Sequence, residues 1–258
     1  MAYHESVSQK IGKLLKDPIN NAGRVIPYLN SKFLPYKRSL FESLNIDTLS
    51  KPYPGHNKLL EYIGSKNGFF IECGGNDGYS YDPTYYLEKF QGWKGIIIEP
   101  LPIAKLCKKN RKASLIYETA LVPFGYNEST IDFIDCNAMS FIDNSIENGA
   151  DWIERGQDSQ NITARKINVP AGTLQSVIDD YNKNNASPIN IDFLVIDVEG
   201  FELEVMRGLN FKINSPSYIL SEAHTDARFD KIKQLLNTFD YEYICEIGEK
   251  DYLFKLKK

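Results

Sequence analysis

The sequence has no apolar run near the 18 residues that a membrane-spanning helix requires, so it predicts no membrane span. The first six residues contain no apolar core of a secretory signal. Closely spaced cysteines are missing too, since Cys73, Cys107, Cys136 and Cys245 form no C-x-x-C pair. We therefore expect a cytoplasmic protein whose cysteines are free and mostly buried thiols.

An excess of positive charge is also absent. The formal net charge of the chain is −4, which argues against nucleic acid as a partner. Hydrophobic residues make up 42% and charged residues 25% of the sequence, as in ordinary soluble globular proteins. A length of 258 residues suits one large α/β domain, alone or with a short extension.

The chain divides into a helical N-terminal extension, residues 1–65, and a domain over residues 66–258. In that domain, continuous apolar strands alternate with helices, a pattern that predicts a mainly parallel sheet covered on both faces. We expect strands at Phe69–Cys73, Ile96–Glu99, Ser114–Ala120, Phe193–Val198 and Tyr218–Ala223. We expect helices at Pro83–Phe90, capped by Asp82, and at Pro102–Lys109, Thr173–Tyr181, Leu203–Gly208 and Phe229–Leu236.

A closing hairpin, an added strand and an insertion complete the predicted domain. Tyr241–Ile247 and Tyr252–Leu256 form a closing hairpin that adds an antiparallel strand to the sheet. Thr130–Asp135 reads as a strand of an added hairpin. The polar stretch 137–166 reads as an irregular, mobile insertion over the active site.

A glycine-rich turn follows the first strand, in the order Glu72, Cys73, Gly74, Gly75, Asn76, Asp77, Gly78. About 20 residues later a second strand ends in Glu99, at the distance where such folds hold a ribose. The pair indicates an adenosine-containing ligand. Because Glu72 would repel a pyrophosphate but suit an ammonium group, we favour S-adenosylmethionine over a dinucleotide.

Acidic side chains also end two later strands. Asp197 and Glu199 follow one strand, and a strand periodicity of two places them on the same side. Glu222 and His224 end the next strand. If the strands are neighbours, Asp197, Glu199 and His224 either hold Mn²⁺ or Mg²⁺, or His224 is a general base oriented by a carboxylate.

These motifs together resemble the FkbM-type S-adenosylmethionine-dependent methyltransferases. The most specific segments are Phe70–Gly78, Ile98–Pro100, Thr173-Leu174, Ile196–Glu202 and Glu204–Gly208. The resemblance implies a Rossmann-like class I methyltransferase fold with a seven-stranded sheet, and methyl transfer to a hydroxyl oxygen. It departs from the family pattern at Gly75-Asn76-Asp77, where a small residue such as alanine is more usual at the first position.

The resemblance also implies roles for individual residues. Asp197 becomes the acid beside the reacting centre. The cofactor-binding residues that it implies are Glu72, Gly74, Asn76, Gly78 and Glu99, with Ala120 and Leu121 as neighbours of the adenine.

The sequence thus predicts an S-adenosylmethionine-dependent O-methyltransferase of carbohydrate biosynthesis, acting on a sugar or nucleotide-linked sugar with help from a divalent metal. Trp152 could stack on the sugar ring, and Arg155, Arg165 and Lys166 could hold a phosphate. A nicotinamide-dependent oxidoreductase and a non-catalytic scaffold of the same fold are the alternatives. A homodimer formed through the helices before Gly68 is a further possibility.

Overall fold

The computed structural model describes residues 53–64, 67–146, 148–160, 162–185 and 187–257. Residues 51–258 form one compact unit. The predicted helical extension therefore lies outside the described residues, except for α5 (His56–Ile63), which packs within the unit through Leu59. In the described part of the chain, no helix combines the length and the apolar character that crossing a membrane requires.

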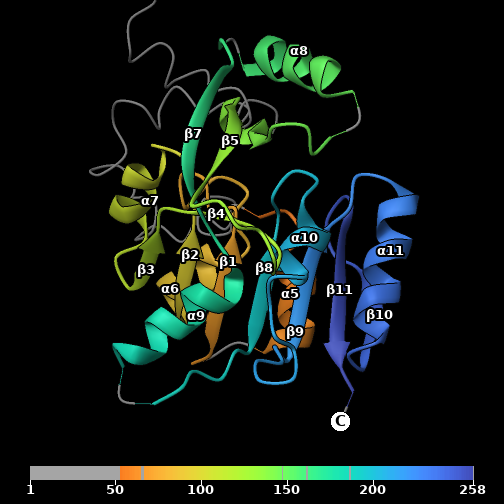
Figure 1. Cartoon of the computed structure of the whole chain (residues 1–258). Helices are drawn as coiled ribbons and strands as arrows, with labels where there is room; N and C mark the ends of the chain where they lie inside the picture. The colour runs from red at the N-terminus through yellow and green to blue at the C-terminus, as the bar shows by residue number, and fades with distance from the viewer. Residues whose placement is uncertain (1–52, 65–66, 147, 161, 186, 258) are drawn as a thin grey trace, which may run out of the picture. The chain divides into compact units, whose positions relative to one another are not determined.

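A seven-stranded sheet forms the centre of the unit, in the order β10-β11-β9-β8-β1-β2-β3 (Figure 1). All of its pairings are parallel except those of β11, which is antiparallel to both neighbours. The predicted mainly parallel sheet with a closing hairpin is confirmed. Its strands are β1 (Phe69–Cys73), β2 (Lys94–Ile98), β3 (Ser114–Tyr117), β8 (Phe193–Ile196), β9 (Tyr218–Glu222), β10 (Tyr241–Glu246) and β11 (Asp251–Leu256).

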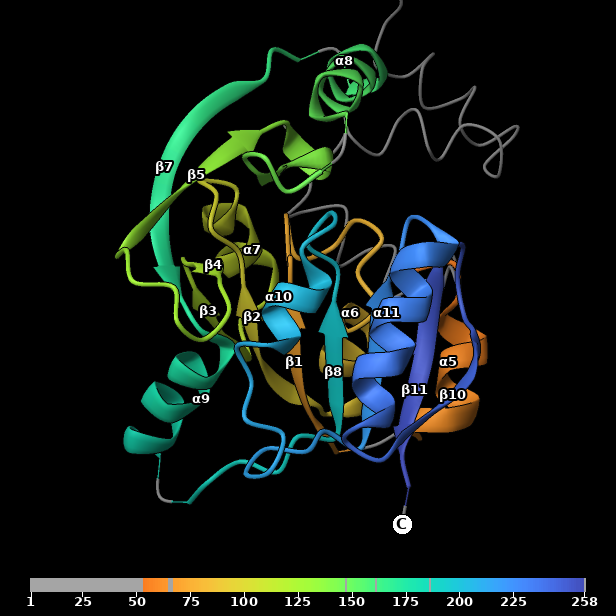
Figure 2. The same ribbon diagram turned by 45° about the vertical axis from the view of Figure 1, so that its right-hand side comes forward.

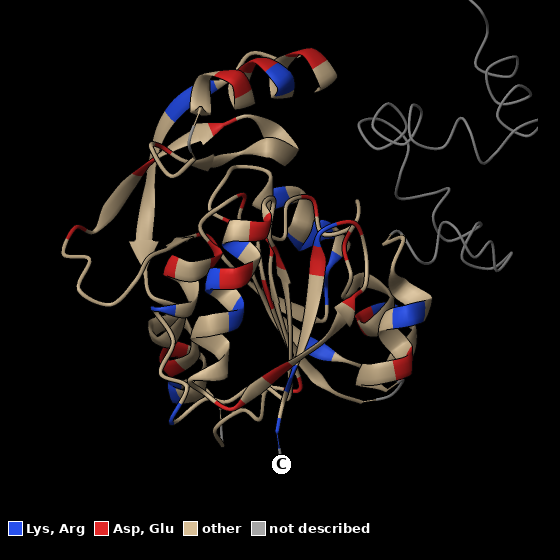
Figure 3. Cartoon of the chain, turned by 90° about the vertical axis from the view of Figure 1, so that its right-hand side faces the viewer, with Lys and Arg blue, Asp and Glu red and all other residues tan. Residues whose placement is uncertain are grey.

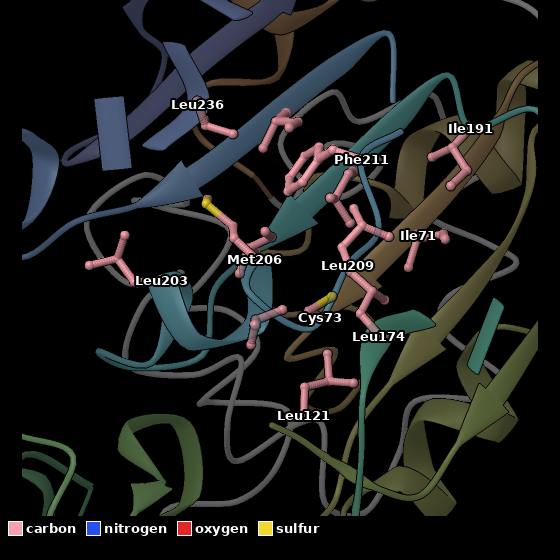
Figure 4. Packing of buried hydrophobic residues seen from close by; sticks show 14 of the residues in the cluster. Ile71, Cys73, Leu121, Leu174, Ile191, Leu203, Met206, Leu209, Phe211 and Leu236 are labelled. Carbon is pink, nitrogen blue, oxygen red and sulfur yellow. The ribbon is translucent and has the colours of Figure 1, made fainter. Parts of the chain in front are cut away.

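Helices cover both faces of this sheet because its strands are apolar on both sides. On one face, Ile71 and Ile196 pack with residues of α9 (Leu174–Lys183), α10 (Glu202–Met206) and α11 (Asp226–Asn237) (Figure 4). On the other face, Phe70 and Val195 pack with residues of α5, α6 (Tyr85–Gln91) and α7 (Ala104–Asn110). The result is a three-layer sandwich whose core lies on both sides of the strands.

Most of the region predicted to be irregular is regular, because it holds one helix and the edge of a second sheet. The four strands of this sheet run in the order β4-β7-β5-β6, and α8 (Gly149–Gln160) follows β6 (Figure 2). The irregular reading of residues 137–166 is therefore wrong. It failed because α8 is an exposed helix of polar sequence in which only Gly156 is buried. The strands are β4 (Ala120–Leu121), β5 (Thr130–Asp135), β6 (Phe141–Ile142) and β7 (Arg165–Gly172).

Two predicted boundaries also change. The strand predicted at Ser114–Ala120 ends at Tyr117, and Ala120 pairs with β7 in the second sheet instead. The helix predicted at Pro83 begins at Tyr85. The N-cap is therefore Thr84 and not Asp82, although the Asp82 carboxylate accepts from the backbone N–H groups of Thr84 and Tyr85.

Candidate active site

The carboxyl ends of four strands meet at one edge of the main sheet. Cys73, the last residue of β1, pairs with Ile98 of β2 and with Ile196 of β8. Beyond these strands, Gly74 N donates to Ile98 O (2.9 Å) and Asp197 N donates to Cys73 O (3.0 Å). The loops after β1, β2 and β8 are thus joined by backbone hydrogen bonds, in the place where open α/β sheets bind their ligands.

Glu99 lies buried at the end of β2, with each carboxylate oxygen held by one backbone donor. Oε2 accepts from Asn76 N (2.8 Å) and Oε1 from Leu101 N (2.9 Å). Burial raises the pKa of Glu99 to about 7, against the two backbone donors that lower it. Each oxygen keeps a second lone pair, so this carboxylate fits the vicinal hydroxyls of a ribose. Ala120 packs in the same small cluster as Leu101, next to this position.

Glu72 does not stand free beside the loop. Its Oε2 accepts from Thr84 Oγ1 (2.5 Å) and lies 3.4 Å from Arg111 Nη1. Arg111, itself 1% exposed, also pairs with Asp82 and Glu88. Burial, and then the charge of Asp82, raises the pKa of Glu72 against the opposing effect of Arg111. The loop of the predicted donor site is therefore anchored by a buried ionic network, and a direct contact of Glu72 with a ligand stays a prediction.

Glu199, Glu222 and His224 form a cluster after β8 and β9. His224 Nε2 lies 3.0 Å from Glu199 Oε2 and 3.4 Å from Glu222 Oε2. One ligand atom from each residue lies within 4.8 Å of the others, close enough to hold a metal ion. The structure thus brings Glu199 and His224 together as predicted, but Glu222 is the third member of this group instead of Asp197.

The reason for this difference is the backbone after β8. The strand ends at Ile196, and Glu199 has φ +53°, so the chain turns and a strand periodicity of two does not apply there. The argument that placed Asp197 and Glu199 on the same side is therefore wrong. The turn is stabilised by Gly200 N, which donates to Glu202 Oε1 (2.7 Å).

Asp197 lines a cavity of about 370 Å³ at the ends of β8 and β9. Its surface is accessible from this cavity, although protein atoms surround it. The carboxyl groups of Asp197 and Glu222 lie close enough to hydrogen-bond. Glu222 also lines the cavity, so Asp197 and one member of the cluster share a wall of it.

The protonation of these groups follows from their crowding. Burial, followed by the charge of Glu202, raises the pKa of Glu199 to about 8. Burial and the neighbouring carboxylates Asp197 and Glu199 raise the pKa of Glu222 well above its usual value. Burial lowers the pKa of His224, so its imidazole is neutral near pH 7. A neutral imidazole is the form that accepts a proton or ligates a metal.

The segment 137–166 contacts this cluster through Trp152, and Arg228 links Ser145 of this segment to the loop after β8. The Trp152 and His224 rings are 4.8 Å apart between centroids, at an angle of 47°. Arg228 of α11 donates to the carbonyl oxygens of Gly200 and Ser145. Two other residues of this region, Arg165 and Lys166, are paired with acids of their own sheet and its loops, namely Asp135, Asp132 and Asp143.

Gly74, Asn76 and Gly78 lie in the loop after β1, as their motif predicts, whereas Leu121 lies in β4. Gly74 and Gly78 have φ of +92° and +71°, and Asn76 has φ +42°. Leu121 belongs to the main hydrophobic core together with Leu174. Sequence reasoning missed Arg111 because an isolated arginine carries no motif. It noted Glu222 at a strand end without choosing it as a ligand, although its spacing of two from His224 was the available signal.

The strand order, the acid after β2 and the glycine loop after β1 define a class I methyltransferase. No curated protein matches the chain. The family model described as "Methyltransferase FkbM domain" matches residues 72–243, more than half of the chain. The chain belongs to this family, and it is an S-adenosylmethionine-dependent methyltransferase.

Two solved structures are also similar to the chain. One is a putative S-adenosyl-L-methionine-dependent methyltransferase from Methanococcus maripaludis, with 10% identity, a TM-score of 0.39, and coverage of 86% of this chain and 93% of that chain. The other is an S-adenosylmethionine-dependent methyltransferase from Aquifex aeolicus, with 12% identity, a TM-score of 0.35, and coverage of 84% and 95%. Similarity at these low identities and TM-scores adds nothing to what the strand order and the family match establish.

Proposed function

We propose that the protein methylates a hydroxyl oxygen of a small molecule, a sugar or a nucleotide-linked sugar, with the help of a divalent metal. The observation that supports this most directly is His224 facing Glu199 and Glu222, beside Asp197 and the glycine loop. A sugar hydroxyl is a weak acid, so its methylation needs a group that removes the proton. The strand edge offers such groups next to the predicted donor site.

S-adenosylmethionine supplies, when bound, a methyl group on a cationic sulfur. In the transfer, the carbon–sulfur bond breaks as the oxygen–carbon bond forms, and S-adenosylhomocysteine is left. With a metal held by His224, the hydroxyl proton would pass to a carboxylate beside it, and without a metal it would pass to His224 Nε2. Glu99 would hold the ribose hydroxyls, and Asp197 would orient the acceptor oxygen in line with the breaking bond.

The metal would be held by Glu199, Glu222 and His224. Two carboxylates and one neutral imidazole are a mixed oxygen and nitrogen set that suits Mn²⁺ or Mg²⁺. The raised pKa values of Glu199 and Glu222 support this choice, because carboxylates crowded without a cation resist ionisation. A divalent ion at this position would lower the pKa of the acceptor hydroxyl, and His224 alone would serve as the base without it.

The experiment is a binding and turnover assay on the full chain. S-adenosylmethionine and NAD are titrated separately by calorimetry, and labelled methyl transfer is measured to a panel of sugars and nucleotide-linked sugars. We expect binding of S-adenosylmethionine but not of NAD, and a fall in methyl transfer of about 100-fold or more in His224→Ala and Asp197→Ala.

The matched control is Glu242→Gln, an exposed residue of β10, which should keep wild-type turnover. Binding of S-adenosylmethionine with full turnover in both active-site variants would overturn the assigned roles. Methylation of nitrogen or carbon in place of oxygen in the product would overturn the proposed O-methylation.

A further inference from the structure

The cavity next to Asp197 lies beside the predicted donor loop and not within it. Its walls come from the segment before α5, from the loop before α6, from the ends of β8 and β9, and from the β10–β11 turn. None of the described residues 72–78, and not Glu99, lines it. It therefore adjoins the site expected for the donor, over the strand ends on the side where an acceptor would lie.

The residues of the cavity wall with charge-bearing side chains are all acidic among the described lining residues. Asp197, Glu222, Glu249 and Asp251 contribute four carboxyl groups, while lysine, arginine and histidine are missing from this part of the wall. Lys250 stands between two of these acids in the sequence but is exposed and does not line the cavity. The distribution of charge on this side of the molecule can be followed in Figure 3.

Two tyrosines complete the wall. Tyr53 donates from its hydroxyl group to Asp251 Oδ2 (2.8 Å), so the ring is fixed beside that carboxylate. Tyr81 is 70% exposed and has φ +56°, an unfavourable conformation for a bulky residue. Aromatic faces beside carboxylates are the surroundings in which proteins bind organic cations.

One oxygen of the Glu222 carboxyl group is an unsatisfied acceptor within the described part of the chain. Glu222 Oε2 is sealed from solvent and has no hydrogen-bond partner among the described residues, since His224 Nε2 is 3.4 Å away. A buried carboxylate oxygen without a donor is costly, so a ligand with an N–H donor in the cavity would be favoured if the Glu222 side chain turned toward it.

The cavity is at the same time unsuited to a phosphate. A wall of carboxyl groups offers an anion no cation to pair with, and two of the three basic residues suggested for phosphate binding, Arg165 and Lys166, are engaged in ion pairs of their own. The third, Arg155, does not line the cavity.

We propose that this cavity binds a protonated amino group of the acceptor, so that the substrate is an amino sugar or a related amino alcohol and not a nucleotide-linked sugar. This inference rests on the proposed methyl transfer to a hydroxyl group. The ammonium group would lie between the carboxylates and the rings of Tyr53 and Tyr81, and it would fix the neighbouring hydroxyl beside Asp197.

The test compares matched probes on the protein saturated with S-adenosylhomocysteine. Glucosamine, galactosamine and mannosamine are titrated by saturation-transfer NMR against their N-acetyl forms and against the corresponding hexose 1-phosphates. We expect at least one amine to bind about tenfold more tightly than its N-acetyl form, with weaker or no binding of the phosphates. Equal binding of amine and N-acetyl forms, tighter binding of a phosphate, or no binding of any amine would overturn the inference.

Variants that each remove one carboxyl group test whether this cavity wall binds the amine. Glu249→Gln and Asp251→Asn each remove one charge from the wall and should weaken binding of the amine about three- to tenfold, without changing that of the N-acetyl form. Glu242→Gln, outside the cavity, should change neither. If these variants weaken S-adenosylmethionine binding instead, the cavity belongs to the donor. Failure of the wild-type protein to bind S-adenosylmethionine would count against the proposed function itself, separately from the amine preference.

Discussion

Gly74 lies directly against the backbone of Asp197, so that a Cβ at position 74 would stand 1.7 Å from the Asp197 carbonyl oxygen. Its φ of +92° is also a conformation that glycine adopts most readily. The loop expected to hold the methyl donor and the acid expected at the reacting centre are therefore fixed to each other through backbone atoms. This contact sets their separation without any side chain.

Gly74→Ala should destabilise the fold for that reason. The clash is with backbone, which cannot rotate away, so we expect a loss of about 3 kcal/mol or more. For a domain of this size that lowers Tm by roughly 6–12 °C. Gly125→Ala is the matched control, with φ +87° but no atom within 4 Å of its added Cβ, and should cost only about 1 kcal/mol. Equal Tm values in thermal unfolding of the two variants would contradict the argument.

Arg111→Met should be strongly destabilising. It leaves three carboxylates, Glu72, Asp82 and Glu88, in the interior without their shared cation, which we expect to cost about 3–5 kcal/mol in urea unfolding at pH 7. The deficit should shrink at pH 5, because Glu72, whose pKa is already raised by burial, then takes up a proton and its uncompensated charge disappears.

The control for Arg111→Met is a substitution at an exposed ion pair. Arg207 reaches Glu204 over one helical turn at 3.1 Å, with 56% of its side chain exposed. Arg207→Met should change stability by less than about 1 kcal/mol at either pH. An Arg111 variant as stable as this control would show that the buried network contributes nothing.

Donor affinity should depend on pH through Glu99. Burial raises its pKa to about 7, and only the carboxylate form offers acceptors to both ribose hydroxyls. As the pH rises from 6 to 8 the group goes from mostly protonated to mostly ionised, so S-adenosylmethionine should bind up to about tenfold more tightly. Calorimetry on Glu99→Gln should give weak binding without this slope, while Glu118→Gln, an exposed acid, should keep it.

Manganese binding separates the two candidate ligand sets. If Glu199, Glu222 and His224 hold the ion, Glu222→Gln and His224→Ala should weaken Mn²⁺ binding about tenfold or more in an EPR titration. Asp197→Asn should then change it by no more than about threefold, and Glu204→Gln, at a partly exposed residue of α10 that pairs with Arg207, should leave it unchanged. The reverse order of effects would restore the set that includes Asp197.

Removing the metal with a chelator tests whether catalysis depends on it. With EDTA present, methyl transfer should fall and should return on adding Mn²⁺ or Mg²⁺. Full activity after chelation, without detectable Mn²⁺ binding, would exclude the metal and leave His224 as the base. Trp152 gives an independent readout, because its ring lies 4.8 Å from that of His224, so a paramagnetic ion there should quench its fluorescence.

Much of the main domain was predictable because its information is local. Continuous apolar strands alternating with helices predict a parallel sheet, and the residues that end each strand are visible in the sequence. Gly74, Asn76, Gly78 and Glu99 could be chosen in this way, since their backbone requirements depend on immediate neighbours. The resemblance carried by Ile196–Glu202 supplied the class of enzyme, which the family match over residues 72–243 confirms.

Only the tertiary structure decided how distant residues combine. The second sheet depends on β7 pairing with β4 and β5. No local sequence pattern predicts strand partners that lie about 30 to 50 residues away. Glu72 is bound to Arg111, 39 positions away. Glu222, and not the predicted Asp197, groups with Glu199 and His224, and the chain turns at Glu199. Sequence alone thus determined the sheet and the class of donor, since both follow from local periodicity and motif. The composition of the reacting centre was decided by long-range packing, which sets the distances between charges.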